Sequence, residues 1–183
     1  MDKKAIFRNK AKKELSKIRV NNYKRDKLLI AQLINYINKS KIKDIMLFIP
    51  LKTEPNISPL IKLLREKGYN VYVPFIKGDT FKLVKYRLPL KIKKIGIKEP
   101  NNSYRYIKSI DLAIVPLLGI DKTNRRIGFG KGMYDRFYSK NGRYIKRTIF
   151  LQRDIYYTKE LITNSYDISA DYIFANSVKF IDI

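Results

Sequence analysis

The sequence predicts an α/β fold: a three-layer sandwich with a largely parallel, Rossmann-like central sheet. Two observations carry this prediction. Short apolar runs that end at proline or glycine alternate along the chain with segments of helical periodicity, the pattern of a sheet covered by helices. The chain has 183 residues, of which 45% are hydrophobic, so it can bury one sizeable core. We therefore expect residues 1–183 to form a single domain.

The predicted helices carry apolar residues three or four positions apart on one face. In the third of them, Ser58 is the expected N-cap, Pro59 takes the first position, and Gly68 ends the helix. The helices are expected at residues 3–19, 23–37 and 58–67, over about two turns from Met133 to the break at Asn141-Gly142, and at 159–162.

The predicted strands are short apolar runs bounded by turn residues. The run Leu112–Val115, closed by Pro116, indicates a buried strand, whereas residues 79–86 alternate as in an edge or antiparallel strand. Residues 91–106 look irregular and basic. Ligands of such sheets bind beyond the carboxyl ends of strands, which singles out the loops after Ile49 and Val115. The strands are expected at residues 44–49, 69–75, 79–86, 111–115, 147–151 and 172–175.

The chain is strongly basic, with 40 Lys and Arg against 16 Asp and Glu and a net charge of +24. Such a charge suits nucleic-acid binding, and a basic RNA- or ribosome-associated protein is the alternative function. The basic residues are spread along the chain, however, and Asn and Ile are abundant beside them, as in proteins of genomes rich in A and T. We favour this compositional explanation and expect no nucleic-acid partner.

Composition also excludes several chemistries. The chain has no Cys and no His, so disulfides, thiolate catalysis, Cys-ligated zinc and imidazole mechanisms are all excluded. No apolar run reaches the roughly 18 residues of a membrane span, and the Lys-rich N-terminus lacks the apolar core of a secretory signal. We expect a cytoplasmic protein with no membrane contact, and a monomer.

The stretch from Asp121 to Tyr138 is the candidate functional loop. It holds Gly128, Gly130 and Gly132, preceded by two adjacent arginines and followed by a predicted helix start. A strand, a basic glycine loop and a helix N-terminus form a cradle for phosphate, because backbone N–H groups point inward and no Cβ blocks them. The spacing matches neither the Walker loop nor the dinucleotide fingerprint. In isolation, the glycines could equally mark a tight hairpin.

These residues, with markers elsewhere in the chain, resemble the signature of the 5-formyltetrahydrofolate cyclo-ligase family (5,10-methenyltetrahydrofolate synthetase). The markers occur in the family's order over nearly the whole chain. They are Lys4, Phe7-Arg8, Pro50, Glu54, Gly96, Glu99-Pro100, Val115-Pro116, Asp121, Asn124, Arg126-Ile127-Gly128, Gly130, Gly132, Tyr134-Asp135-Arg136, Gln152, Asp167 and Asp171.

The resemblance implies ATP- and Mg²⁺-dependent conversion of 5-formyltetrahydrofolate to 5,10-methenyltetrahydrofolate, with release of ADP and phosphate. ATP phosphorylates the formyl oxygen, N10 of the folate attacks the same carbon, and phosphate departs. Such a reaction asks mainly for positioning and charge stabilisation, which a chain without His or Cys can provide. Another phosphotransferase on the same fold remains an alternative, against which only Glu54 and Glu99-Pro100 argue.

The resemblance also implies roles for particular residues. Asp135 and Asp167 are expected to hold Mg²⁺, and Arg126, Lys131 and Tyr134 to serve catalysis. The folate is expected to contact Ile49, Glu54, Phe129, Gly130, Lys131, Gly132 and Met133. ATP is expected to contact Lys4, Arg8, Arg126, Ile127, Gly128, Phe129, Gly130, Lys131, Gly132, Met133 and Tyr134.

The chain departs from the family pattern at four positions. Met133 stands where the family has a tyrosine, which replaces aromatic stacking with a softer contact. Leu117 and Asn124 replace glycines, and Tyr166 replaces a histidine, so a proton-handling role at that position is in doubt. None of these changes removes a phosphate or metal group, and we expect the activity to be retained.

Overall fold

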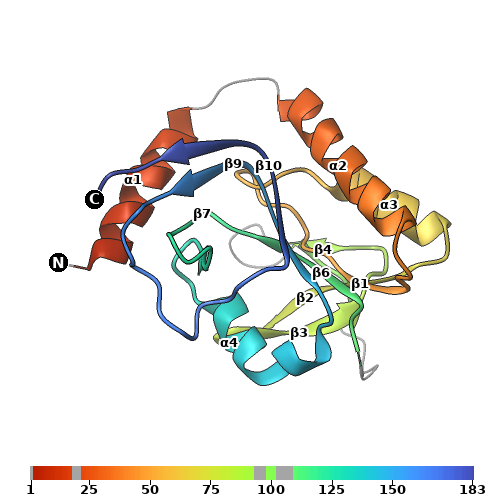
Figure 1. Ribbon diagram of the computed structural model, residues 1–183. Helices are drawn as coiled ribbons and strands as arrows, with labels where there is room; N and C mark the ends of the chain where they lie inside the picture. The colour runs from red at the N-terminus through yellow and green to blue at the C-terminus, as the bar shows by residue number, and fades with distance from the viewer. Residues whose placement is uncertain (1, 18–21, 93–97, 102–108) are drawn as a thin grey trace.

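A mostly parallel sheet forms the middle layer of the protein, with helices on both faces (Figure 1). The computed structural model describes residues 2–17, 22–92, 98–101 and 109–183. Within these residues an eight-stranded sheet runs in the order β3-β2-β1-β6-β9-β7-β8, and β10 pairs with β9. The predicted α/β sandwich is therefore confirmed. The strands are β1 (Asp44–Met46), β2 (Asn70–Lys77), β3 (Thr80–Lys85), β6 (Leu112–Pro116), β7 (Gly119–Ile120), β8 (Arg126–Ile127), β9 (Thr148–Tyr157) and β10 (Tyr172–Phe180).

The centre of the sheet is parallel and apolar on both faces. β1 pairs in parallel with β2 and β6, and β6 pairs in parallel with β9. Along β6, Leu112 and Ile114 enter one core, whereas Ala113 and Val115 enter the other. This explains the continuous apolar run, because a strand covered on both faces has no polar side. β3 is antiparallel to β2, as its alternating sequence predicts.

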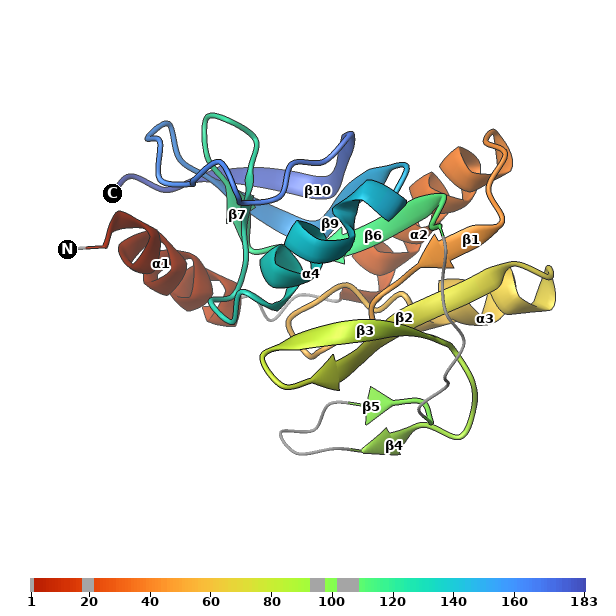
Figure 2. The ribbon, with the colours of Figure 1, turned by 90° about the horizontal axis from the view of Figure 1, so that it is seen from below.

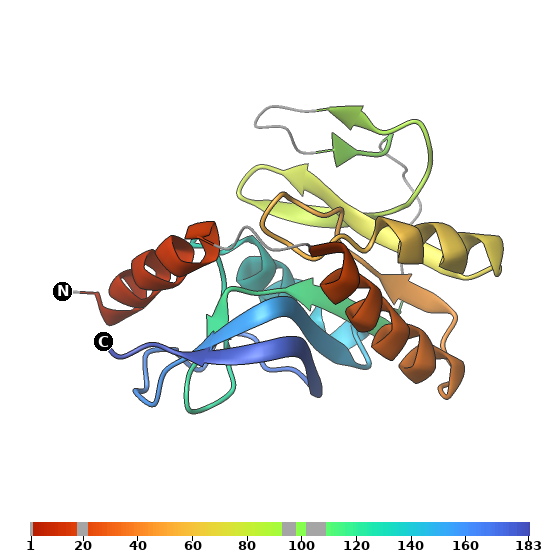
Figure 3. The same ribbon diagram turned by 90° about the horizontal axis from the view of Figure 1, so that it is seen from above.

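Helices α2 (Asn22–Asn38) and α3 (Ser58–Glu66) cover one face of the sheet (Figure 3). The row Leu29, Leu33 and Ile37 of α2 is buried in this core. Ser58 is not the N-cap of α3: the cap is Ile57, and Ser58 is already helical. The amide N–H of Ser58 donates to Oδ1 of Asn56 (3.2 Å), so a neighbouring side chain takes over the capping role.

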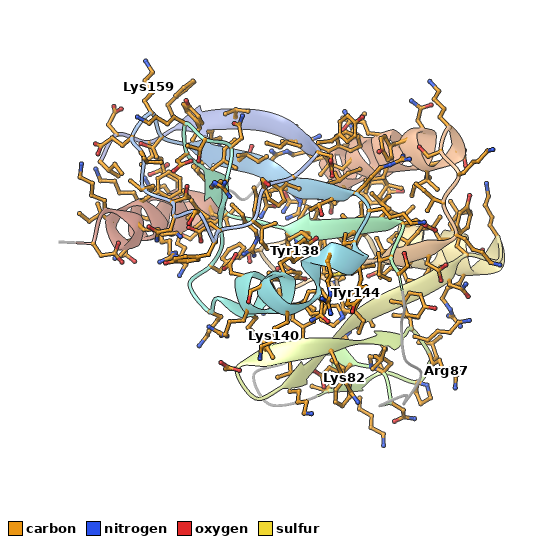
Figure 4. The ribbon with its side chains drawn as sticks, turned by 60° about the horizontal axis from the view of Figure 1, so that its bottom comes forward. Lys82, Arg87, Tyr138, Lys140, Tyr144 and Lys159 are labelled. Carbon is orange, nitrogen blue, oxygen red and sulfur yellow. The ribbon has the colours of Figure 1, made fainter. Side chains whose placement is uncertain are left out.

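Helix α4 (Met133–Asn141) covers the opposite face (Figure 2). Phe137 packs there against Phe81 of β3, with ring centroids 4.4 Å apart. The hydroxyl of Tyr138, labelled in Figure 4, hydrogen-bonds Thr148 Oγ1 at the start of β9 (2.9 Å). Burial raises the pKa of Tyr138. The helix begins at Met133 as predicted, and its position on the sheet is set by aromatic packing.

Helix α1 (Lys3–Lys17) lies beside β7 and the chain's C-terminus. Phe7 and Ala11 are buried against Leu118, Ile127 and Tyr156. The N-terminal helix is thereby placed next to the glycine loop. Residues 18–21, where its predicted end falls, lie outside the described residues.

Strand β9 runs well past its predicted end at Leu151. Its first half pairs with β6, and Tyr156 and Tyr157 pair with β7. The extension contains Arg153 and Asp154, which are polar but buried. Arg153 donates to both carboxylate oxygens of Asp26 (2.6 and 2.9 Å), and Asp154 pairs with Arg25. Charges paired in this way can be buried, so the strand continues where the apolar pattern stops.

Four other predicted segments differ from the structure. Strand β1 ends at Met46, and β10 continues to Phe180. The predicted helix at 159–162 is wrong: this segment is irregular. The basic stretch 91–106 contains paired strands β4 (Lys91–Ile92) and β5 (Lys98–Glu99), while Gly96 and Ile97 lie outside the described residues.

No helix in the described part of the chain is both long and apolar enough to span a bilayer.

Candidate active site

The glycine loop connects β8 to α4 and owes its shape to residues that accept a left-handed backbone. Gly130 has φ of 107° and Gly132 has φ of 63°, where a side chain would be strained. Asn124, in the turn before β8, has φ of 56°, a conformation that asparagine tolerates better than most residues. Gly132 is also the N-cap of α4, so the loop leads directly into the first helical turn.

Gly128 is required for close packing against Arg126. A Cβ at this position would lie 2.5 Å from Nη1 of Arg126. Arg126 is only 5% exposed; its Nε donates to the carbonyl oxygen of Pro116 (2.9 Å), and its guanidinium lies 4.9 Å from the centroid of the Tyr134 ring. The structure therefore places Arg126 beneath the glycine loop, between the end of β6 and the start of α4.

A pocket of about 620 Å³ opens beside this loop and collects six of the predicted site residues. They come from α1, the glycine loop, α4 and the segment between β9 and β10. The predicted residues in the lining are Lys4, Arg8, Gly130, Gly132, Asp135 and Asp167; Asp2, Arg136, Ser139, Ile162, Asn164 and Tyr166 complete it.

Three cations on one face of α1 reach the glycine loop and the pocket. Lys4 Nζ lies 2.5 Å from Oδ2 of Asp167, and Arg8 Nε donates to the carbonyl oxygen of Gly128 (3.1 Å). Lys12, which the motif did not include, donates to the carbonyl oxygen of Phe129 (2.8 Å). Lys12 follows Arg8 by four residues, which places the two side chains on the same helix face. This spacing is the feature of the sequence from which Lys12 could have been predicted.

The two predicted metal ligands, Asp135 and Asp167, line the same pocket. Asp135 Oδ1 is buried without a hydrogen-bond partner in the structure, and Nη1 of Arg126 lies 3.7 Å away. A carboxylate oxygen of this kind suits a hard cation. Among the described residues no group of three or more Asp, Glu, His or Cys comes together. Two carboxylates at one pocket are compatible with Mg²⁺, an ion that usually takes several of its ligands from phosphate and water.

Glu54, in the segment after β1, does not line this pocket but interacts electrostatically with Arg126 and Tyr134. It is 7% exposed, and its Oε2 accepts the amide N–H of Leu51 (2.9 Å). Burial raises the pKa of Glu54 to about 7, although the Leu51 N–H and the charge of Arg126 act in the opposite direction. Burial, and then the charge of Glu54, raises the pKa of Tyr134. Glu54, Arg126 and Tyr134 thus share one electrostatic environment.

The remaining predicted residues take different positions. Ile127 is fully buried against α1, which leaves only its backbone for contact with a ligand. Lys131 is exposed, and its carbonyl oxygen accepts Nη2 of Arg136 (2.6 Å). Phe129 and Met133 are half-buried on separate apolar cores. Ile49 is half-buried in the loop that carries Glu54.

Asp121 is a functional-site residue whose role the sequence did not reveal. Its fully buried carboxylate accepts hydrogen bonds from Thr123 and from the backbone of Ile162 and Thr163 (2.8–3.0 Å). Burial opposes its ionisation, but the hydrogen bonds from Thr123 and Thr163 outweigh it and lower the pKa of Asp121 to about 2. These bonds tie the β7–β8 turn to the segment after β9 and hold the backbone at Ile162 and Thr163. The Asp-x-Thr pattern, typical of such turns, was the only local signal.

The model of the 5-formyltetrahydrofolate cyclo-ligase family matches residues 1–174. The chain belongs to this family. The family membership makes it an enzyme, a ligase of folate one-carbon metabolism. The departures from the family pattern have local explanations: Leu117 is fully buried and accepts Gln152 Nε2 (3.0 Å), whereas Tyr166 is 68% exposed on the pocket rim.

Individual cyclo-ligase relatives support the same conclusion. The 5-formyltetrahydrofolate cyclo-ligase of Haemophilus influenzae is 28% identical over 142 residues, covering 70% of this chain and 76% of the relative. That of Mycoplasma genitalium is 30% identical over 146 residues, covering 76% of each. The Aquifex aeolicus 5,10-methenyltetrahydrofolate synthetase structure has the same fold, with a TM-score of 0.74 at 24% identity, covering 94% of this chain and 89% of that one. The Mycoplasma pneumoniae synthetase structure gives 0.65 at 22% identity, with 93% and 97% covered.

Proposed function

We propose that this protein converts 5-formyltetrahydrofolate to 5,10-methenyltetrahydrofolate with consumption of ATP, acting as one domain over residues 1–183. The observation that carries the proposal is the arrangement of charged residues around the glycine loop. Lys4, Arg8 and the two aspartates line the pocket, whereas Glu54 is not part of its lining and is linked to the site through the charge of Arg126, which also lies 3.7 Å from Asp135. A phosphate donor and a folate acceptor can then meet at the loop.

On the nucleotide side, Lys4 and Arg8 bind the phosphates of ATP together with the backbone N–H groups of residues 127–134. The N-terminus of α4 adds favourable charge for an anion. Lys131 stays in contact with the phosphoryl group during its transfer to the formyl oxygen and stabilises its negative charge. Arg126 stabilises this charge from beneath the loop. These interactions strengthen as charge develops in the transition state, which is the condition for catalysis.

On the folate side, the Glu54 carboxylate binds the N–H-rich edge of the pterin. Ile49 and the stretch from Phe129 to Met133 contact the folate around this edge. Tyr134 packs under Arg126 and orients its guanidinium. With the formyl carbon held beside N10, attack of N10 on the activated carbon forms the ring C–N bond; the C–O bond to phosphate breaks, and the N10 proton passes to the departing phosphate or to water.

Asp135 and Asp167 would hold Mg²⁺, whose contribution is to neutralise charge on the ATP phosphates. The proposal needs no metal ligand beyond these two carboxylates, phosphate and water.

An absorbance assay for methenyl-folate formation tests the proposed function. Product should accumulate from 5-formyltetrahydrofolate at neutral pH only when both Mg²⁺ and ATP are present. A folded protein that forms no product under these conditions would falsify the proposal.

The partners that follow are small molecules, 5-formyltetrahydrofolate and ATP. Basic side chains lie on several parts of the surface, among them Arg87, Lys140 and Lys159 (Figure 4), and the absence of a nucleic-acid partner stays a prediction from the sequence. The cytoplasmic location and the monomeric state stay predictions from the sequence.

A further inference from the structure

The segment between β9 and β10 carries Asp167 on an irregular backbone. Residues 158–171 contain no helix and no strand. A loop of this kind has no ladder of backbone hydrogen bonds to fix its side chains, so its geometry depends on contacts from other parts of the fold. A carboxylate that holds a metal must nevertheless be kept in place closely.

The β7–β8 turn supplies these contacts. Asp121 accepts hydrogen bonds from the backbone of Ile162 and Thr163, at the start of the pocket-lining part of the segment. At the other end, the amide N–H of Arg126 donates to the carbonyl oxygen of Ile168 (2.8 Å). The turn and the start of β8 therefore fix the backbone at both ends of residues 162–168.

The Asp167 carboxylate itself is held by Lys4 and the amide N–H of Asn164, and Arg125 provides the turn's contact to the backbone of this residue. Arg125 Nη1 donates to the carbonyl oxygen of Ser165 (3.1 Å) and to that of Asp167 itself (2.8 Å). These two carbonyls flank Tyr166, so one guanidinium fixes the backbone on both sides of the residue before Asp167. The side chain of Arg125 is half-buried, so it can be replaced without opening the core.

The adjacent arginines thus act on different carboxylates of the same pocket. Arg126 lies 3.7 Å from the carboxylate of Asp135, whereas Arg125 holds the backbone of Asp167. We infer that Arg125 is a positioning residue that orients Asp167 for metal binding. This inference rests on the proposed function, because it takes Asp167 as a ligand of Mg²⁺. Residues that orient a metal ligand in this way typically contribute about 10- to 100-fold to metal affinity.

Three variants test the inference: Arg125→Met, Arg125→Lys and, as a matched control, Arg143→Met. The exposed Arg143 contacts the Tyr144 hydroxyl and ring in the structure, away from the pocket. Mn²⁺ affinity is measured by electron paramagnetic resonance with a non-hydrolysable ATP analogue present. Arg125→Met should weaken Mn²⁺ binding by about tenfold or more, and Arg125→Lys should restore part of it, because an ammonium group can still donate to a carbonyl. In Arg125→Met, the turnover at saturating Mg²⁺, the KM for folate and the Tm should stay close to those of wild type.

The outcomes separate this inference from the proposed function. If the wild-type protein binds no Mn²⁺ with the nucleotide analogue, the metal assignment itself fails, and the role of Arg125 fails with it. If wild type binds Mn²⁺ and Arg125→Met binds it equally tightly, the positioning role is overturned while the proposed function stands. If Arg125→Met loses Mn²⁺ affinity and folate affinity equally and has a lower Tm, the positioning role is also overturned. Such a result would mean that the substitution destabilises the whole protein.

Discussion

The ammonium nitrogen of Lys4 lies 2.5 Å from Oδ2 of Asp167, and both side chains are largely buried at the wall of the pocket. The same carboxylate oxygen accepts the amide N–H of Asn164 (2.7 Å). A proposed phosphate ligand and a proposed metal ligand are thus paired with each other. Metal and nucleotide can bind together by exchanging these partners: the carboxylate turns to the cation, and the ammonium turns to a phosphate.

Replacing Lys4 with Met should therefore move two affinities in opposite directions. The affinity for ATP should fall by about tenfold or more, because a hydrogen bond to a charged group is worth roughly 1.5–3 kcal/mol. The affinity for Mn²⁺ without nucleotide should rise, because Asp167 loses its competing cation. Calorimetric titrations of each ligand measure both effects.

Lys3→Met is the control for this prediction, because Lys3 pairs with Glu160 at the surface with 61% of its side chain exposed. It should leave both affinities within about twofold of wild type, as expected for an exposed ion pair. Weaker Mn²⁺ binding in Lys4→Met would contradict the exchange of partners.

Asp135→Asn should abolish turnover and leave folate binding largely intact. The buried Oδ1 of Asp135 has no hydrogen-bond partner in the structure, so the amide removes negative charge from the pocket, and with it the 3.7 Å ion pair with Arg126, without breaking a hydrogen bond at this oxygen. Fluorescence titration with folate and the absorbance assay separate the two effects. Asp182→Asn, at an exposed position near the C-terminus, serves as the control. Wild-type turnover in Asp135→Asn would show that the metal assignment is wrong.

Gly128→Ala should damage the site, whereas Gly142→Ala should not. A Cβ on Gly128 would lie 2.5 Å from Arg126 Nη1, and the buried guanidinium cannot move without losing its bond to Pro116. We expect a loss of roughly 1–3 kcal/mol in stability, as for other overpacked sites, together with slower turnover.

Gly142 differs in both respects: its φ is −55°, and the nearest atom to an added Cβ is 3.6 Å away. Alanine at this position should be neutral or slightly stabilising. Thermal unfolding and turnover of the two variants give the comparison. Equal behaviour of both would mean that the packing of Arg126 against the loop does not matter.

The local pattern of the sequence was enough to predict the elements that pack through apolar side chains. The run Leu112–Val115 and the row Leu29, Leu33 and Ile37 are buried as their periodicity predicts. The true end of β9 was not predictable in this way. Arg153 is stabilised there by Asp26, 127 residues away, and a local window carries no information about such a pair.

The candidate site likewise contains residues that the sequence could identify and residues that it could not. The motif located the residues that project into the pocket, because phosphate and metal binding need particular side-chain types at fixed spacing. It included Asp121 without giving it a role and did not include Lys12 or Arg125 among the site residues; the partners of these three side chains are largely backbone groups of distant segments. Any residue type offers such a backbone group, so these contacts can be recognised only once the fold brings the segments together.

Glu54 combines burial with a raised pKa, and this makes the stability of the protein depend on pH. Its pKa is about 7 in the folded protein against 4.5 for an ordinary glutamate. The folded state holds the proton more tightly than the unfolded state. The stabilising contribution of the protonated carboxyl is therefore complete below pH 4.5 and is lost as the pH rises to about 7.

Glu54→Gln removes this titration while keeping an oxygen that can accept the Leu51 N–H. The variant should match wild type in stability near pH 4.5 and exceed it above pH 7, by roughly 1–3 kcal/mol, since each pKa unit corresponds to about 1.4 kcal/mol. Its affinity for folate at pH 8 should fall, because the carboxylate that binds the pterin is gone. Denaturant unfolding at pH 5 and pH 8, with folate titrations at pH 8, measures both effects.

Glu66→Gln provides the comparison, because Glu66 is exposed at the end of α3. Its stability relative to wild type should be the same at both pH values. A pH-independent difference for Glu54→Gln as well would mean that the Glu54 carboxyl is not held protonated by burial. If Glu54→Gln gained stability above pH 7 and still bound folate as tightly as wild type, the burial of this carboxyl would need an explanation other than folate recognition. The prediction is that stability is given up at this position for substrate binding, so the two properties should change in opposite directions.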